Sequence, residues 1–241
     1  MNSPALTILG AGYVGAALWR RFPAAIATRR HPAPQMLHFD LTEATSWSNI
    51  PCKGRHVVWT FPAEPLAQVQ AYHDTCLKEA ASLIVLGSTS AYQLDDETGT
   101  PWLAEDAPID ANLARVQGEE WLRSRGATVL RLAGLFGPGR EPAGWLQRGR
   151  IKDGAKLVNL IHVDDVVATI AALLARPRPG VTINVTNGEP LSWRELATRL
   201  RQRGELPADW QLPASIPGCF GKRIAIHRLR EMLPNHHFQQ P

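Results

Sequence analysis

The sequence predicts an α/β fold, in which a doubly wound parallel sheet of the Rossmann type carries a small C-terminal lobe. Short apolar runs alternate with longer amphipathic stretches along most of the chain, the pattern of βα units around a parallel sheet. The first apolar run leads into a glycine-rich turn at residues 10–15, GAGYVG. With 241 residues and 44% hydrophobic content, the chain can bury one large core.

The strands are predicted from the short apolar runs. They lie at 5–9, 24–27, 36–39, 56–60, 83–87, 128–132 and near 182–185. The amphipathic stretches predict helices at 13–22, 65–80, 112–125, 163–175 and 193–203. Pro65 suits a first helical turn, Gly126 suits the left-handed position after a helix, and Ser192 suits a helix N-cap.

Composition argues against several classes of partner. The formal net charge is +4, but Lys and Arg are interspersed with Asp and Glu, and a nucleic-acid or membrane-surface footprint requires clustering. Cys52, Cys76 and Cys219 are odd in number and widely spaced, so neither a disulfide framework nor a zinc site is expected. The longest apolar run, 166–175, is too short to span a bilayer. We expect a cytoplasmic protein without a membrane segment or a nucleic-acid partner.

The glycine-rich turn has the context of a dinucleotide site, because it follows a strand and opens a helix. Gly10 permits the sharp turn, Gly12 leaves room for a pyrophosphate, and Gly15 lets the helix and strand pack closely. The phosphates would lie on the N-terminus of the helix. Further cofactor contacts are expected from Tyr13 and Val14 within the turn and from Thr60, Phe61 and Pro62 after the fourth strand. The alternative is a glycine turn without a ligand.

The end of the second strand favours NADP over NAD as the cofactor. NAD sites commonly place an acidic residue there for the ribose 2′-hydroxyl, whereas this chain reads Thr28, Arg29, Arg30. Guanidinium groups suit a 2′-phosphate, although one or both arginines could instead be solvated at the strand end. Asp40 is expected either to accept a hydrogen bond from the adenine amine or to cap the turn before Thr42. NAD stays an alternative cofactor.

Four segments, taken in order, resemble the extended short-chain dehydrogenase/reductase superfamily, which includes nucleotide-sugar epimerases, dehydratases and reductases. They are residues 87–92 (GSTSAY), 130–139 (LRLAGLFGPG), 161–166 (IHVDDV) and 183–192 (INVTNGEPLS). The glycine turn, the strand end at 28–29 and residues 132–140 resemble, more narrowly, the atypical YeeZ-like subgroup of NAD(P)-dependent epimerase/dehydratase-like proteins. The resemblance implies a small-molecule substrate that is sugar-like or acidic, and it allows a homodimer through the helices predicted at 65–80 and 112–125.

The chain departs from the superfamily at its catalytic pair. The resemblance implies a Tyr-x-x-x-Lys motif on the helix after the fifth strand, where alignment on Gly118 and Glu119 places Ala111 and Arg115 instead. An alanine cannot relay a proton, and an arginine stays protonated. Arg115 is expected either to bind the cofactor ribose or an acidic substrate group, or to pair with Glu119 one turn on.

Other chemical candidates have alternative structural roles. Ser88 matches the family position that hydrogen-bonds the reacting oxygen, but hydroxyls at a strand end also form turns. Tyr92 is either a replacement acid/base or a phenol packed under the loop. His162 and the aspartates beside it are expected to be structural, with Asp164 capping a helix. His236 and His237 are too few for a metal claim, so no metal is predicted.

Two functions fit these observations best. The first is an NADP-dependent oxidoreductase or epimerase-like enzyme with Ser88, Tyr92 and Arg115 as catalytic candidates; the second is a non-catalytic NADP-binding sensor. A third, epimerisation with a tightly bound redox cofactor used once per cycle, also fits the resemblance but is disfavoured more by the missing tyrosine. Residues 1–135 are expected to form the NADP-binding Rossmann domain, with its sheet completed by about 157–186. Glycine and proline crowd together at 134–155 and 206–221, so the remaining segments of 136–241 are expected to form a loop-rich, substrate-binding lobe.

Overall fold

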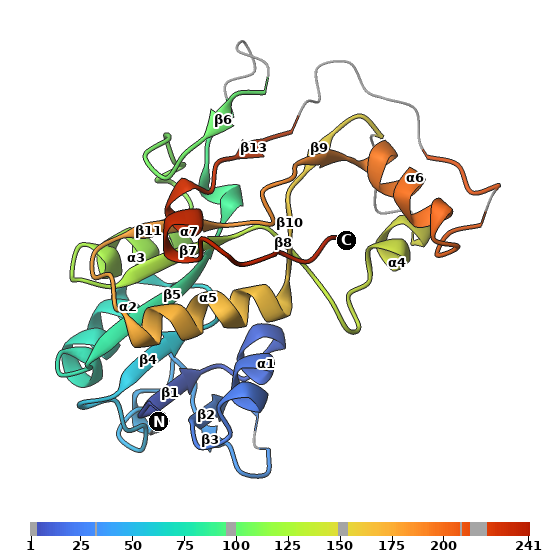
Figure 1. Ribbon diagram of the computed structural model, residues 1–241. Helices are drawn as coiled ribbons and strands as arrows, with labels where there is room; N and C mark the ends of the chain where they lie inside the picture. The colour runs from blue at the N-terminus through green and yellow to red at the C-terminus, as the bar shows by residue number, and fades with distance from the viewer. Residues whose placement is uncertain (1–3, 32, 95–99, 149–153, 208, 213–220) are drawn as a thin grey trace.

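A computed structural model describes residues 4–31, 33–94, 100–148, 154–207, 209–212 and 221–241. Its centre is a parallel sheet in the order β11-β7-β5-β4-β1-β2-β3 (Figure 1). The strands are β1 (Leu6–Leu9), β2 (Ile26–Arg29), β3 (Leu37–His38), β4 (His56–Trp59), β5 (Ser82–Ser88), β7 (Thr128–Leu132) and β11 (Thr182–Val185). The order reverses direction between β1 and β4, which is where ligands bind in sheets of this kind. The predicted α/β fold is confirmed.

Helices cover both faces of the sheet, so the strands are apolar on both sides. On one face α1 (Tyr13–Arg21) and α5 (Val163–Ala175) pack over a core that includes Ile8, Val58 and Ile84. On the other face α2 (Leu66–Tyr72) and α3 (Ala114–Arg123) pack over a second core. Residues that alternate along β4 and β5 point into different cores.

The predicted helix at 65–80 is interrupted. It is α-helical only over α2 and then widens into one π-type turn, η2 (His73–Leu77). The Thr75 hydroxyl donates to the carbonyl oxygen of Ala71 at 2.7 Å in this turn. Such a side-chain bond to the backbone competes with the regular helical ladder. β2 also lies two residues later than predicted, because Thr28 and Arg29 pair with Leu37 and His38 of β3.

A third apolar core lies outside the main sheet, between α4 (Pro142–Gln147) and α6 (Trp193–Gln202). Short strands connect this part to the sheet: β8 (Gly134–Phe136) pairs with β10 (Leu160–His162), and β9 (Leu157–Val158) pairs with β12 (Leu191–Ser192). Ser192 caps α6 as predicted, in a capping box with Glu195. Part of the predicted loop at 134–155 is therefore regular, namely 134–136 and 142–147, while most of 206–221 lies outside the described residues.

A short strand pair and the last helix lie beside the edge of the sheet at β11. The strand β6 (Trp102–Leu103) pairs with β13 (Arg223–Ile224), and α7 (His227–Met232) contacts β11. Short 3₁₀ turns occur at η1 (Ala44–Ser46) and η3 (Thr89–Ala91).

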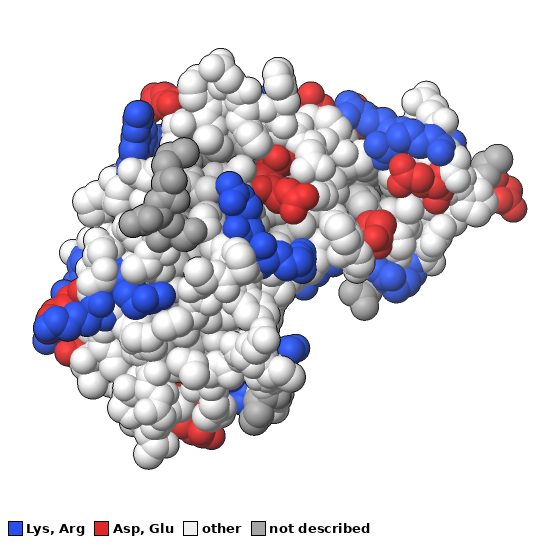
Figure 2. Space-filling model, turned by 60° about the horizontal axis from the view of Figure 1, so that its bottom comes forward, with Lys and Arg blue, Asp and Glu red and all other residues white. Residues whose placement is uncertain are grey.

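Among the described residues, we find no helix with the length and apolar character that a membrane span requires. On the face drawn in Figure 2, basic and acidic side chains occur in small neighbouring groups, and no continuous basic surface is formed.

Candidate functional site

The glycine turn between β1 and α1 has the backbone geometry that the motif predicts. Gly10 has a φ of 91°, which favours glycine. A Cβ at position 15 would lie 2.1 Å from the carbonyl oxygen of Gly10, so only glycine lets α1 begin this close to β1. A Cβ at Gly12 would meet nothing within 4 Å. Gly15 is thus packed tightly against Gly10, whereas the space beside the Gly12 Cα is open. An open space at the N-terminus of α1 fits a pyrophosphate.

Two threonines hold the turn from neighbouring strands. The Thr28 hydroxyl accepts a hydrogen bond from the Gly10 amide at 3.0 Å, and the Thr60 hydroxyl donates to the carbonyl oxygen of Leu9 at 3.0 Å. Thr28 is fully buried, so its side chain supports the turn from β2 and does not face a ligand.

A cavity of about 330 Å³ opens beside the turn, and Gly10, Gly12, Arg29, Arg30, Asp40 and Phe61 help to line it. Arg30 Nε lies 2.9 Å from a carboxylate oxygen of Asp40. The other oxygen of Asp40 accepts hydrogen bonds from the amide and the hydroxyl of Thr42, which hold the pKa of Asp40 below its ordinary value. Asp40 therefore caps the local turn and also lines the cavity. Arg29 is exposed, and no ion-pair partner of Arg29 is found in the described part of the chain.

A second cavity, of about 220 Å³, continues toward the end of β5. It shares Phe61 with the first cavity and is also lined by Val14, Thr60, Pro62, Ser88, Arg115 and Glu119. We call the two cavities together the groove. The groove runs from the glycine turn, across the switch point between β1 and β4, to the carboxyl end of β5.

A series of polar contacts lies at the end of the groove next to β5. Ser88 Oγ lies 2.9 Å from Ser90 Oγ, and Arg115 donates to Ser90 Oγ at 3.0 Å. The other terminal nitrogen of Arg115 lies 3.5 Å from Glu119. The structure thus brings Ser88 and Arg115 together through Ser90, and Arg115 also makes the predicted pairing with Glu119.

Helix α3 can bring these side chains to the groove because Gly118 allows a close approach. A Cβ at position 118 would lie 1.9 Å from the carbonyl oxygen of Ala63, in the loop after β4. The absence of a side chain at Gly118 therefore lets α3 pack directly on that loop. Arg115 and Glu119, on either side of Gly118 along the helix, consequently reach the wall of the groove.

Glu119 is a residue whose importance the sequence reasoning missed. Its side chain is 1% exposed and lies against the backbone of Gly87, where an added Cβ would come within 2.6 Å of the carboxylate. One of its oxygens has no hydrogen-bond partner among the described residues. Burial raises the pKa of Glu119 to about 7, while the nearby guanidinium groups of Arg115 and Arg131 act in the opposite direction. In the sequence, Glu119 is marked by its place beside Gly118 in the family motif and by its spacing of four residues from Arg115, and neither signal predicts its burial.

The structure does not bring Tyr92 into the groove. Its phenol is buried and donates to Asn184 at 2.6 Å, and the Arg131 guanidinium lies over its ring at 4.7 Å. Burial raises the pKa of Tyr92. These contacts favour the packing role over the acid/base role.

His162 caps α5 with its own side chain, which corrects the expectation that Asp164 is the cap. His162 Nδ1 accepts a hydrogen bond from the Asp164 amide at 3.2 Å. Asp165 is buried and binds His236 at 2.7 Å, so it anchors the C-terminal segment. No group of three metal-ligating side chains is found in the described ranges. The prediction for Cys219 lies outside them.

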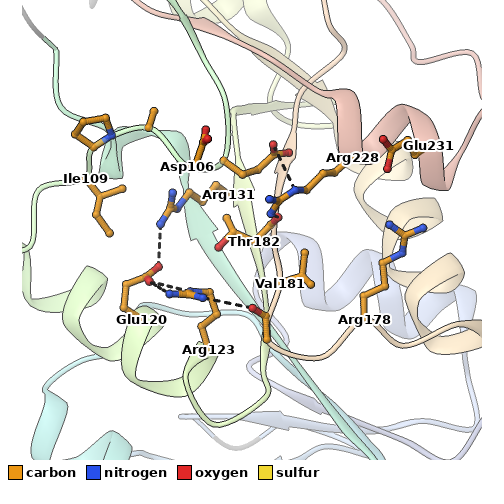
Figure 3. Close-up of a pocket in the computed structure, with 14 residues that line it drawn as sticks. Asp106, Ile109, Glu120, Arg123, Arg131, Arg178, Val181, Thr182, Arg228 and Glu231 are labelled. Carbon is orange, nitrogen blue, oxygen red and sulfur yellow. Dashed lines mark hydrogen bonds and ion pairs between the residues drawn. The ribbon is translucent and has the colours of Figure 1, made fainter.

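A larger cavity, of about 720 Å³, lies at the β11 edge of the sheet, away from the groove (Figure 3). Three of its arginines, Arg123, Arg131 and Arg228, pair with acidic residues of the same cavity. Figure 3 shows Glu120 between Arg123 and Arg131. The carboxylate oxygens of Glu120 lie 2.7 Å from Arg123 Nη2 and 2.9 Å from Arg131 Nη2. Arg228 lies 3.9 Å from Glu105. Because these charges neutralise one another and the glycine turn lies several strands away, we do not place the functional site here.

Comparison with known proteins gives partial sequence matches, and no family model matches the chain. The chain is 37% identical to Protein YeeZ from Escherichia coli K12 over 128 residues, which are 50% of this chain and 45% of that protein. It is 32% identical to 2′-dehydrokanamycin reductase from Streptomyces kanamyceticus over 151 residues, 59% of this chain and 42% of that enzyme. The chain thus spans less than half the length of these curated relatives.

Solved structures match over nearly the whole chain. A short-chain dehydrogenase/reductase superfamily protein from Agrobacterium tumefaciens with bound NAD has a TM-score of 0.76 at 16% identity, covering 98% of this chain and 93% of that one. MoeE5 in complex with UDP-glucuronic acid and NAD has a TM-score of 0.73 at 18% identity, covering 98% and 94%. At these identities the likeness shows the fold alone. Together, the fold and the sequence similarity support the resemblance that the motifs predict, to the YeeZ-like subgroup of the extended short-chain dehydrogenase/reductase superfamily.

Proposed function

We propose that this protein is an NAD(P)-dependent oxidoreductase or epimerase-like enzyme that works without the Tyr-x-x-x-Lys pair. The observation that carries the proposal is that two cavities meet at Phe61, one beside the glycine turn and one at the end of β5. We infer that one extended ligand passes this side chain and reaches from Gly12 to Ser88. The two solved structures described above, which share this fold, both contain NAD.

The residues of the groove fit a nicotinamide dinucleotide. Open space above Gly12 suits the pyrophosphate, and Arg29 offers an unpaired guanidinium for a 2′-phosphate at the end of β2. Arg30 forms an ion pair with Asp40, which neutralises part of its charge. In this proposal, Arg29 therefore contributes most of the preference for NADP. When bound, the nicotinamide ring supplies hydride transfer at the far end of the groove.

The chain's own residues at that end can orient and stabilise a reacting oxygen. The Ser88 hydroxyl donates a hydrogen bond to the oxygen, and Ser90 supports Ser88. Contacts with Ser90 and Glu119 fix the Arg115 guanidinium in place. In this position its positive charge can stabilise negative charge on the substrate. We further propose that the part around α4 and α6 supplies the substrate-binding lobe. A sugar-like or acidic substrate suits this combination of hydroxyls and a cation.

A second candidate, a non-catalytic NADP-binding sensor, is favoured by the burial of Tyr92. Its phenol is committed to Asn184, and the position of the family tyrosine holds Ala111. Under this proposal the groove binds the cofactor but transfers no hydride.

Titration with NADPH and NADH, followed by a panel of carbonyl compounds, separates the two candidates. An oxidoreductase is expected to bind NADPH and to cause a loss of NADPH absorbance with at least one class of carbonyl compound. Tight binding without turnover over a broad panel would favour the sensor, and binding of neither nucleotide would exclude both.

Replacement of Arg29 by alanine tests the cofactor preference. We expect about a tenfold loss of affinity for NADPH, because a charge-assisted contact to the 2′-phosphate disappears, and little change for NADH. Arg21, an exposed arginine in the last turn of α1, provides a control variant, Arg21→Ala. An unchanged ratio of NADPH to NADH affinity in Arg29→Ala would contradict the assignment of NADP.

A further inference from the structure

A turn from a distant part of the chain lies against the start of α1. The turn consists of residues 137–140, which connect β8 to α4, and it is closed by a hydrogen bond from the Arg140 amide to the Gly137 carbonyl oxygen at 2.8 Å. A Cβ at Gly137 would come within 2.9 Å of the Tyr13 hydroxyl. Because Tyr13 is the first residue of α1 and directly follows Gly12, this turn lies beside the first turn of α1.

Arg140 extends from this turn over the Tyr13 ring. Its guanidinium carbon lies 4.2 Å from the ring centroid. A guanidinium stacked on an aromatic face keeps its N–H groups in its own plane, where they can still donate hydrogen bonds. Tyr13 thus fixes the position of the positive charge without using its donors.

No carboxylate neutralises Arg140 in the described part of the chain. The adjacent carboxylate, that of Glu141, accepts a hydrogen bond from the Gly139 amide at 2.7 Å instead. The pKa of Tyr13 is raised by burial, and the charge of Arg140 opposes this rise, which agrees with a guanidinium close to the ring. An exposed, stacked and unpaired arginine at the start of α1 therefore adds positive charge where an anion is expected.

We propose that Arg140 binds the pyrophosphate of the dinucleotide, opposite the backbone amides of the glycine turn. A guanidinium can bind phosphate oxygens in a bidentate manner, which suits a linear pyrophosphate. This inference rests on the proposed function only in requiring a dinucleotide above Gly12. Since residues 137–140 lead directly into α4, the bound cofactor also ties the α4–α6 part of the molecule to the main sheet.

The test compares NADPH with adenosine 2′-monophosphate, a fragment that keeps the adenine and the 2′-phosphate but lacks the pyrophosphate. In Arg140→Ala we expect about a tenfold loss of NADPH affinity, as measured by calorimetry, with affinity for the fragment unchanged within twofold. Arg148→Ala removes a neighbouring arginine at the end of α4, outside the proposed site, and should leave both affinities unchanged. Thermal unfolding of each variant reports whether the fold is retained.

The outcomes separate this inference from the proposed function. If the unaltered protein binds NADPH tightly and Arg140→Ala binds it equally well, Arg140 does not contact the pyrophosphate, while the groove remains the cofactor site. Equal losses for NADPH and for the fragment would also overturn the inference, because they indicate a general disturbance of the groove. Failure of the unaltered protein to bind any dinucleotide would overturn both proposals.

Discussion

Replacing Glu119 by glutamine should change how the stability of this protein depends on pH. The carboxyl is buried beneath the groove against Gly87, and burial raises its pKa from an ordinary value of 4.5 to about 7. Glutamine has the same shape as the neutral acid, and its oxygen can still accept a hydrogen bond from Arg115. Glu119→Gln therefore removes the titration and keeps the packing.

The sign of the effect follows from the raised pKa. A carboxyl that binds its proton more tightly in the folded than in the unfolded state contributes its full stability below pH 4.5, and it loses that contribution as the pH rises through 7. A rise of the pKa from 4.5 to about 7 corresponds to roughly 3 kcal/mol of unfolding free energy. Between pH 5 and pH 8, about 2 to 3 kcal/mol of this should be lost.

Urea unfolding of both proteins at pH 5, 6, 7 and 8 gives the relevant difference. Subtracting the unfolding free energy of the unaltered protein from that of Glu119→Gln cancels the other titrating groups. The difference should move in favour of the variant by about 2 to 3 kcal/mol as the pH rises. A second pair made in an Arg115→Met background should show the change at higher pH, because Arg115 opposes the rise in the pKa of Glu119. A difference that stays constant from pH 5 to pH 8 would refute the burial of an ionisable Glu119.

Three further substitutions separate support of the fold from ligand binding. Gly15→Ala should destabilise the protein by roughly 1 to 3 kcal/mol in urea unfolding, because its Cβ would lie 2.1 Å from the Gly10 carbonyl oxygen; unchanged stability would contradict this packing. Gly12→Ala should leave stability nearly unchanged but lower NADPH affinity at least tenfold in calorimetry, since its Cβ projects into open space; equal affinity would argue against a pyrophosphate there. Tyr92→Phe should lose roughly 1 to 2 kcal/mol of stability, because the buried Asn184 side chain loses its donor, while NADPH affinity is retained; a selective loss of turnover would restore Tyr92 as a catalytic candidate.

The sequence by itself determined the features that depend on local pattern. Strands β7 and β11 and helix α5 have their predicted bounds, because continuous apolar runs and amphipathic stretches encode buried parallel strands and covering helices. The glycine turn was likewise predictable, since Gly10 and Gly15 each answer a backbone requirement within a few residues of chain. The short paired strands β8 and β10 were not, because two or three residues carry no periodicity.

Only the tertiary structure decided how the candidate site is assembled. Tyr92 lies near Ser88 in sequence but points to Asn184 of β11, whereas Glu119 reaches the groove because Gly87 and Gly118 leave space for it. Arg140 lies beside the glycine turn although more than a hundred residues separate them. Burial, charge pairing and such distant contacts arise when helices pack on a sheet, so they depend on which elements become neighbours and not on the order of residues along one element.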